Sequence, residues 1–418
     1  MTKSHHLKSR LTAIVFLLLS AAWIFPAPSL PAITSENNKI DAGKAKNASS
    51  IPGVGFPSVL ESTVAELETH FRENGPLIEL LRRNADFYRA HLSEIKSEDG
   101  LKENLRALIS KLNIVPMIRL YNHHDQMFWI ARSLATGRDD SPGKIGALFE
   151  RRGDRWFVSH VFPKSEASSA ALQRGDEILG AGDRPFDPVY SFGSPSGGRP
   201  VKLVWRRDPW SQPRVAEPNP VNESYEKILF SAQENSFLSF NLEGKRIFYY
   251  HVWSLRDKKW ILGLTDFAAK AQKSADVFVL DLRDGYDDGF DHSERLEGIF
   301  IKDKKTSDGR DSIYTKPLVL IVNQNTAGNK EKLAHMIRNT KRAPLVGVST
   351  KGCFLKRNHI FYAGGEWLLA VPDLDPDKQA GYREGVGIEP EVFVKDVLVY
   401  AGGEDLLFNK AMEVAKSL

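Results

Sequence analysis

The chain has 418 residues, of which 42% are hydrophobic and 26% charged, as is ordinary for a soluble globular protein. At roughly 100–200 residues per domain, this length predicts about two or three domains. The formal net charge of +4 is small and no long basic run occurs, so nothing favours a nucleic-acid partner. The single cysteine excludes an internal disulfide, so ordinary hydrophobic cores must stabilise the fold.

The N-terminal segment has the order of a secretory signal. Lys3, Lys8 and Arg10 precede an almost wholly apolar run over residues 11–25, and prolines and small residues follow. The apolar run is shorter than the roughly 20 residues that a membrane-spanning helix needs. We expect residues 1–32 to be a signal peptide cleaved after Ala32, with an uncleaved membrane anchor as the alternative. The protein is then expected in the periplasm or cell envelope of a bacterium, or secreted.

Residues 33–57 are rich in Ser, Asn, Lys, Pro and Gly, which indicates a flexible linker. Apolar residues then recur at helical spacing between residues 58 and 114, with interruptions at 74–76 and 99–100. This pattern predicts a helical N-terminal region over residues 58–135.

Short strands with turn signals begin near residue 144. We expect strands at 145–150, 156–162, 175–179 and 201–206, with a short helix at 165–172. These elements predict a β-rich domain over residues 136–207. Residues 208–223, rich in Pro, Asn and Ser, are expected to form a second linker.

Strand and helix patterns alternate from residue 224 to residue 418. Strands are expected at 246–252, 277–282, 318–322, 345–348 and 367–371, and helices at 261–274, 331–339 and 406–418. The runs 277–282 and 318–322 are almost continuously apolar, as in strands that are buried on both faces of a sheet. This alternation predicts an α/β layer architecture.

Three segments of the β-rich domain resemble a PDZ domain. They are I-G-A-L-F at 145–149, P-K-S-E-A at 163–167 and L-Q-R-G-D-E-I at 172–178, in the expected order. A PDZ domain binds a peptide C-terminus, which adds a strand to the sheet edge while loop N–H groups hold its carboxylate. The resemblance implies that Ile145, Gly146, Ala147, Leu148 and Phe149 bind such a peptide. The alternative is that Gly146 only permits a tight loop.

Four further segments resemble the tail-specific, or C-terminal processing, serine peptidases. They are V-L-D-L-R at 279–283, K-P-L-V-L-I-V-N at 316–323, K-R-A-P-L-V-G at 341–347 and E-G-V-G-I-E-P-E at 384–391. The resemblance covers roughly residues 115–418. It implies a crotonase-like α/β peptidase core that follows a PDZ-like domain. The core is then of the α/β class, and the whole chain is α+β.

The family's catalytic residues are not retained. Peptidases of this family use a serine nucleophile and a lysine base, accompanied by a glutamine. By resemblance those positions fall on Gly328, Cys353 and Arg357. Glycine has no side chain and cannot attack a carbonyl, and an activated serine needs a base to accept its proton. The turn from Asp284 to Gly289 also departs from the family pattern, which puts the oxyanion site in doubt.

Other residues are weaker catalytic candidates. Thr326 and Lys351 each lie two residues before a lost family position, where a turn would aim their side chains elsewhere. Cys353 stands in no recognisable relation to a histidine, and a lone cysteine is usually a small core residue. These positions keep open the alternative of an active peptidase with a rearranged site.

The sequence also lacks a recognisable metal or cofactor site. His123, His124 and Asp125 are adjacent, so their side chains are expected to point in different directions and not to share a metal. The acidic residues between 284 and 291 lack the spacing of an EF-hand. We therefore expect no metal and no cofactor.

Three functions remain open. The first is a non-catalytic peptidase homologue that binds polypeptide C-terminal tails, or envelope proteins, through the PDZ-like domain. The second is an active serine-type peptidase that cleaves protein tails with a rearranged site. The third is a structural envelope protein.

Overall fold

The computed structural model describes residues 55–112, 118–137, 140–193, 199–287, 291–301, 312–362, 365–372 and 384–418. The chain divides into two compact units, Met1–Gly53 and Val54–Leu418, and the described residues all belong to the second. The expected signal peptide (1–32) and all but the last three residues of the first linker lie outside the described residues. Within the described part, no helix is both long and apolar enough to cross a bilayer.

The N-terminal region is helical, as predicted. It contains α1 (Phe56–His70), α2 (Gly75–His91), η1 (Leu92–Glu94), α3 (Glu98–Ser110) and α4 (Gln126–Thr136). The side chains of Asn74 and Ser97 accept main-chain N–H bonds at the starts of α2 and α3, which is how such residues stabilise a helix N-terminus. The helix α1 begins at Phe56, so the last two residues of the expected linker, 56 and 57, are helical.

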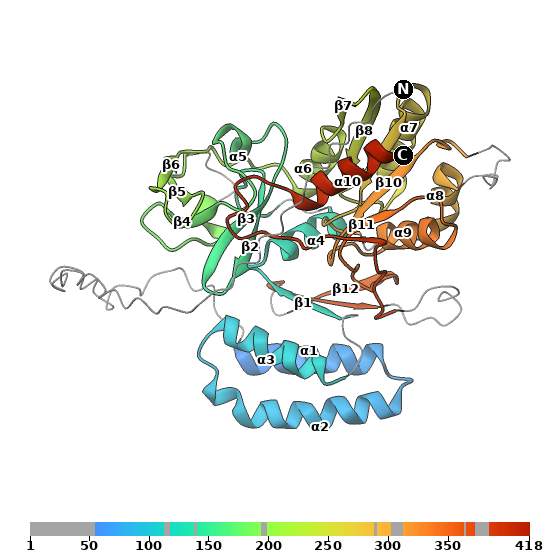
Figure 1. The fold of residues 1–418 in the computed structure, drawn as a ribbon. Coiled ribbons are helices and arrows are strands. Elements are labelled where there is room, and N and C mark those ends of the chain that lie inside the picture. The colour runs from blue at the N-terminus through green and yellow to red at the C-terminus, as the bar shows by residue number, and fades with distance from the viewer. Residues whose placement is uncertain are drawn as a thin grey trace, which may run out of the picture. The chain divides into compact units, whose positions relative to one another are not determined.

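The helical region shares a sheet with the C-terminal half of the chain. Strand β1 (Arg119–Asn122) pairs antiparallel with β13 (Trp367–Pro372), which also pairs with β12 (Arg357–Tyr362). One face of this sheet packs against α1–α3, which Figure 1 shows gathered beside β1 and β12. Sequence patterns missed β1 because four residues give too short a periodicity.

The β-rich region is a five-stranded antiparallel sheet in the order β2-β3-β4-β5-β6. Its elements are β2 (Ala147–Arg152), β3 (Arg155–Val161), α5 (Glu166–Ser169), β4 (Glu177–Ala181), η2 (Tyr190–Phe192), β5 (Leu203–Arg206) and β6 (Arg214–Ala216). The strand β6 lies inside the expected linker 208–223, so that prediction is wrong for residues 214–216, which extend the sheet beyond β5.

A six-stranded sheet forms the α/β core in the order β14-β11-β10-β9-β8-β7. All neighbours are parallel except β7, which is antiparallel to β8 at one edge. The strands are β7 (Leu238–Leu242), β8 (Lys245–His251), β9 (Val277–Asp281), β10 (Leu318–Val322), β11 (Leu345–Gly347) and β14 (Val392–Phe393). The helices are α6 (Tyr225–Glu234), α7 (Lys258–Ser274), α8 (Ser293–Phe300), α9 (Asn329–Asn339) and α10 (Leu406–Ser417).

Both faces of the parallel sheet are covered. In β9, Phe278 and Leu280 pack with α7, α8 and α9, whereas Val277 and Val279 pack with α10. Alternate residues of a strand point to opposite faces, so a run of apolar residues is what such a sheet requires. The α/β fold class is confirmed, and the predicted strands 277–282 and 318–322 match β9 and β10 to within one residue.

Candidate functional site

The chain segments that leave β9, β10 and β11 meet at one edge of the core sheet. Parallel strands place their carboxyl ends together, and this edge is where open α/β sheets usually bind ligands. Gly328 caps the N-terminus of α9 after β10, and Cys353 follows β11. The Gly328 N–H donates to the Cys353 carbonyl over 2.7 Å, so the fold brings these two positions together.

The backbone around Gly328 leaves no space for a side chain. Its φ is +63°, a conformation that L-residues rarely adopt. A Cβ placed on this residue would lie 1.8 Å from the Asp287 carbonyl oxygen. A serine could therefore enter here only if the chain at Asp287 moved, so substituting serine for glycine is not a simple restoration of the family nucleophile.

Cys353 and Arg357 belong to a buried polar cluster with Glu384. One terminal nitrogen of Arg357, Nη2, donates to Cys353 Sγ and to Glu384 Oε1, each over 2.6 Å. The other Glu384 oxygen accepts the N–H groups of Phe354 and Leu355 over 2.8 and 3.0 Å. Cys353 is 1% exposed, which fits the prediction of a small core residue. By the family resemblance, a permanent cation that is already paired thus stands at the glutamine position, and the Cys353 thiol stands at the position of the lysine base.

Glu331 holds the chain that leads to Cys353. It is fully buried in the first turn of α9 and accepts N–H bonds from Gly352 over 2.6 Å and from Cys353 over 2.7 Å. The Thr350 hydroxyl also donates to it. Burial raises the pKa of Glu331 to about 7, against the lowering effect of these donors. Glu331 therefore positions the strand-to-loop connection and has its acceptor atoms occupied.

Lys330 is a functional candidate that sequence analysis missed. It lies two residues after Gly328, is 1% exposed, and its ammonium donates to the Asp284 carbonyl. Its own N–H donates to Asp287 Oδ2 over 3.0 Å. Burial lowers the pKa of Lys330 to about 8, which is the range of a lysine general base. A lysine two residues inside a helix carries no sequence signal of this kind, because only the folded chain buries it.

Thr326 and Lys351 are placed differently from Lys330. Thr326 is fully buried; its hydroxyl donates to the Leu282 carbonyl and accepts the Asn323 N–H, each over 3.0 Å. Lys351 lines the cleft in front of the site, and burial together with Arg119 lowers its pKa. Thr326 is thus a turn-forming residue, while Lys351 can meet a ligand.

The turn after β9 binds the β-rich sheet through an ion pair. Asp284 Oδ2 lies 3.1 Å from His160 Nε2 of β3, and Asp284 Oδ1 accepts from the side-chain amides of Asn323 and Asn325. Burial opposes ionisation of Asp284, yet His160 and Asn325 hold its pKa well below the usual range. The next residues of this turn that the sequence singled out, Asp288 and Gly289, lie outside the described residues.

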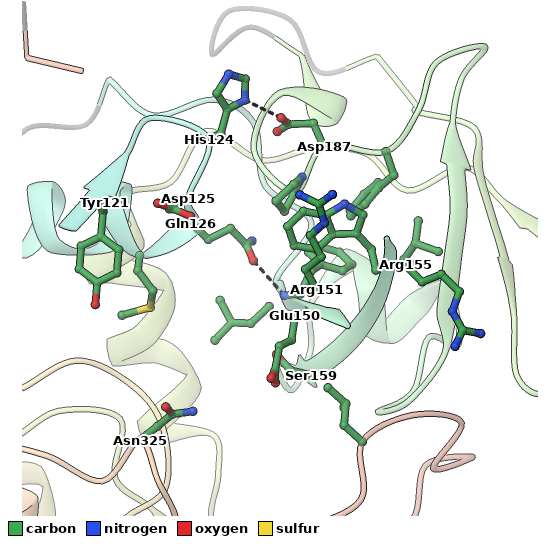
Figure 2. A pocket seen from close by; sticks show the side chains of 18 of the residues that line it. Tyr121, His124, Asp125, Gln126, Glu150, Arg151, Arg155, Ser159, Asp187 and Asn325 are labelled. Atoms are coloured by element: carbon green, nitrogen blue, oxygen red, sulfur yellow. Dashed lines mark hydrogen bonds and ion pairs between the residues drawn. The ribbon is translucent and has the colours of Figure 1, made fainter. Parts of the chain in front are cut away.

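A cleft with a volume of about 1450 Å³ lies in front of these residues. Figure 2 shows it between the start of α4, near Gln126, and the strands that carry Glu150 and Ser159, with Asn325 at one end. Its walls come from α3, from β1 and the start of α4, from β2 and β3, and from the turns after β9 and β10. A polypeptide could run from the β2 edge to the turn at Asn325.

The residues of the expected peptide-binding loop are Ile145, Gly146, Ala147, Leu148 and Phe149. The carbonyls of the first two accept the N–H groups of Ala167 and Phe162, so this part of the loop is closed onto its own domain. Gly146 has a φ of +75°, and a Cβ there would lie 2.3 Å from the Ser165 Cβ. The loop therefore requires glycine at position 146 for its tight conformation, whether or not it binds a peptide.

The free edge of β2 is occupied by one side chain. The Gln126 amide nitrogen donates to the Ala147 carbonyl over 3.1 Å, and its oxygen accepts the Phe149 N–H over 2.9 Å. Figure 2 shows this side chain reaching from α4 to β2. These are the main-chain groups that an added peptide strand would use. Gln126 thus imitates one residue of such a strand. No sequence pattern predicts this contact, because it joins residues that only the fold brings together.

His123 and His124 do not point apart, contrary to the sequence-based expectation. Their ring centroids are 4.3 Å apart, and Glu98 of α3 joins them in a group whose ligand atoms all lie within 4.8 Å of one another. A tight turn between β1 and α4 brings the rings together. Asp125, the third residue of that prediction, pairs instead with Lys102 over 2.6 Å.

Residues 247–394 match the family model of peptidase family S41. The chain resembles the C-terminal processing peptidases of this family. The matched stretch contains Gly328, Cys353 and Arg357, so the departures from the catalytic pattern lie inside it. A search of curated proteins found no match.

Solved structures with similar folds include two proteases and mature CPAF. A photosystem II D1 C-terminal processing protease is 16% identical, with 84% of this chain and 98% of that chain covered and a TM-score of 0.46. A protein of Bacteroides fragilis NCTC 9343 described as an S41 protease is 14% identical, with 74% and 90% covered and a TM-score of 0.48. Mature CPAF is 10% identical, with 86% and 97% covered and a TM-score of 0.48. Because the sequence identities and TM-scores are this low, these structural similarities do not assign a function.

Proposed function

We propose that this S41-related chain is an exported protein that binds polypeptide C-termini and does not hydrolyse them by serine–lysine chemistry. The observation that carries the proposal is the backbone at Gly328, where the Asp287 carbonyl occupies the space of a nucleophile side chain. A serine peptidase needs a hydroxyl at this point and a base beside it. Neither Gly328 nor the Arg357-paired Cys353 supplies these groups.

Peptide binding is supported by the cleft and by the form of the β2 edge. The Ala147 carbonyl and the Phe149 N–H both bond to one side-chain amide, that of Gln126, and Gln126 and Phe149 line the cleft. A peptide that displaced this amide would gain the same two hydrogen bonds and could continue the strand pairing toward Arg151. The far end of the cleft presents the side chains of Asn325 and Lys351.

Export rests on the basic, apolar and small-residue segments before residue 33. The proposed location is the bacterial periplasm or cell envelope, or the medium. Fractionation of cells that express the full chain tests it. Export predicts protein outside the cytoplasm, shortened if the signal is cleaved and full-length if it stays as an anchor. Protein confined to the cytoplasm would contradict this part of the proposal.

Fluorescence anisotropy with C-terminal peptides tests the binding function. A labelled peptide that ends in apolar residues and a free carboxylate should bind the full-length chain, and its C-terminally amidated form should bind at least tenfold more weakly. The amidated form is the matched control because it differs only at the carboxylate. Equal binding of both forms, or no binding across a library of free-acid peptides, would favour the structural envelope protein instead.

A second function is favoured by one observation, the buried Lys330 with a pKa lowered to about 8. Such a lysine could serve as a general base in an active peptidase with a rearranged site. Covalent serine- and thiol-directed probes, read by mass spectrometry, test this alternative. An active peptidase would be established if one residue in the cleft is labelled stoichiometrically and this labelling is lost in a folded Lys330→Met variant. Absence of labelling supports a non-hydrolytic role.

A further inference from the structure

The group formed by Glu98, His123 and His124 lies outside the peptidase site. Glu98 begins α3, and the two histidines form the turn between β1 and α4. One potential ligand atom from each residue lies within 4.8 Å of the other two. His123 Nε2 is 3.2 Å from Glu98 Oε2, so imidazole and carboxylate already face each other. Two imidazoles and a carboxylate are a donor set that zinc and related first-row metals accept.

The Nδ1 atom of each histidine also has a hydrogen-bond partner. The Nδ1 atom of His123 lies 2.6 Å from the Tyr190 hydroxyl, and the Nδ1 atom of His124 lies 2.7 Å from Asp187 Oδ2. Figure 2 shows the His124–Asp187 contact at the rim of the cleft. Metal-binding histidines almost always use one ring nitrogen for the ion and bond the other to a carboxylate or similar group. With Nδ1 used in each ring, the second nitrogen of each histidine is Nε2, and that of His123 already faces the Glu98 carboxylate.

The charge and geometry of the group favour a cation over an isolated ion pair. Two carboxylates, Glu98 and Asp187, flank two imidazoles whose centroids lie 4.3 Å apart with their planes inclined at 41°. Protonating both rings would place two positive charges side by side, whereas one divalent ion between the Nε2 atoms and Glu98 would satisfy all three residues. His123 is largely buried, which limits its access to solvent.

We propose that Glu98, His123 and His124 bind one Zn²⁺ ion, with Asp187 and Tyr190 orienting the histidines. The three ligands leave a fourth position for water or for a ligand in the cleft, because Glu98 and His124 line its wall. The ion would join α3, the β1–α4 turn and the Asp187–Tyr190 segment, which lies between β4 and β5 of the β-rich region. It would thereby fix the rim of the cleft two residues from Gln126.

Isothermal titration with ZnCl₂ tests this site. The full-length chain is used without an affinity tag and with His5→Gln and His6→Gln, so that the N-terminal histidine pair cannot bind the metal. We expect one equivalent of Zn²⁺ to bind and MgCl₂ to give no heat at the same concentration. A His123→Asn/His124→Asn double variant should lose binding. Asp187→Asn, which keeps every ligand, should weaken it roughly 10- to 100-fold.

The control is His91→Gln, which removes a histidine of α2 outside the group and should leave zinc binding unchanged. Absence of zinc binding overturns the proposal, as does stoichiometric binding that survives in the double variant. Circular dichroism in EDTA checks that each variant folds. Should the double variant fail to fold, Asp187→Asn decides, because unchanged affinity in that variant contradicts the proposed histidine-orienting contact.

Discussion

The turns around Gly328 and the edge of β2 lie on the same cleft, but their polar groups are used differently. Around Gly328 the groups are buried and paired with one another, as in the contacts of Arg357 with Cys353 and Glu384. At the β2 edge a single amide, Gln126, covers the main-chain groups. The first arrangement can change only if the core rearranges. Gln126 is also buried, and its amide nitrogen reaches the Tyr225 hydroxyl as well, but a ligand strand can replace its two bonds to β2 without unpairing a buried charge. This difference is why binding is a better-supported function than hydrolysis.

The largest expected effect comes from adding one methyl group at Gly328. Gly328→Ala should cost more than about 4 kcal/mol of unfolding free energy, or prevent folding, because a Cβ would collide with the Asp287 carbonyl. Gly402→Ala is the matched control: its φ is also positive, at +61°, but nothing lies within 4 Å of its Cβ position. The control should lose only about 1–2 kcal/mol from the backbone strain alone.

Urea unfolding, followed by circular dichroism, measures both variants. Equal losses of unfolding free energy in Gly328→Ala and Gly402→Ala would mean that the main chain at Asp287 moves aside at little cost. In that case the space for a nucleophile side chain could reopen, and the contrast between a closed catalytic region and an open binding edge would fail.

Removing the cation of the buried cluster should have the next largest effect. Arg357→Leu leaves the Glu384 carboxylate buried without its partner, at an expected cost of about 3–5 kcal/mol. Lys410→Met breaks the exposed Lys410–Glu413 pair and should change little. Urea unfolding of the two variants gives the comparison. A small loss for Arg357→Leu would show that water reaches Glu384 and that the cluster is not sealed.

His251 should make the core sensitive to acid. Burial lowers the pKa of His251 to about 4, so between about 6.5 and 4 the unfolded chain binds more protons than the folded one. Stability therefore falls as the pH drops through this range, by about 3 kcal/mol from this residue. Thermal or urea unfolding of the wild type should show this loss, and His251→Gln should show less of it. The variant His91→Gln keeps the buried residue and should follow the wild type; parallel curves for all three proteins would contradict the assignment.

Opening the β2 edge should have the smallest effect, and it acts on binding. Gln126→Leu removes the amide that competes with a peptide, so affinity for a free-acid peptide should rise roughly tenfold, about 1.4 kcal/mol. Lys410→Met alters an exposed residue of α10 that does not line this cleft, and should leave affinity unchanged. Fluorescence anisotropy measures both. Weaker binding by Gln126→Leu would mean that Gln126 supports the ligand site and does not cover it.

The sequence predicted elements with long or strong patterns better than short ones. Apolar runs located β9 and β10, and the helical stripe located α9 except for its first two residues. The sequence patterns missed the helices α6 and α8 and five strands, namely β1, β6, β7, β12 and β14. Short elements owe their existence to pairing with distant strands, as β1 does with β13, and local patterns do not report such pairing.

For the site, the family resemblance placed the catalytic positions at Gly328, Cys353 and Arg357 but did not show what surrounds them. The position of the Asp287 carbonyl, the burial of Lys330 and the contact of His160 with Asp284 depend on residues brought together from far apart in the chain. The same is true of the Gln126 amide on β2. Spacing can therefore predict which family residues are lost, whereas only the folded chain shows whether their places have been filled.

Binding and cleavage of one peptide, measured in the same sample, test the central claim most directly. A labelled free-acid peptide with an apolar tail is held with excess full-length chain, its binding is read by anisotropy, and its mass is followed through a long incubation. We predict a bound peptide whose mass does not change. A shortened peptide, produced by the wild type but not by a folded Lys330→Met variant, would contradict the account and establish an active peptidase.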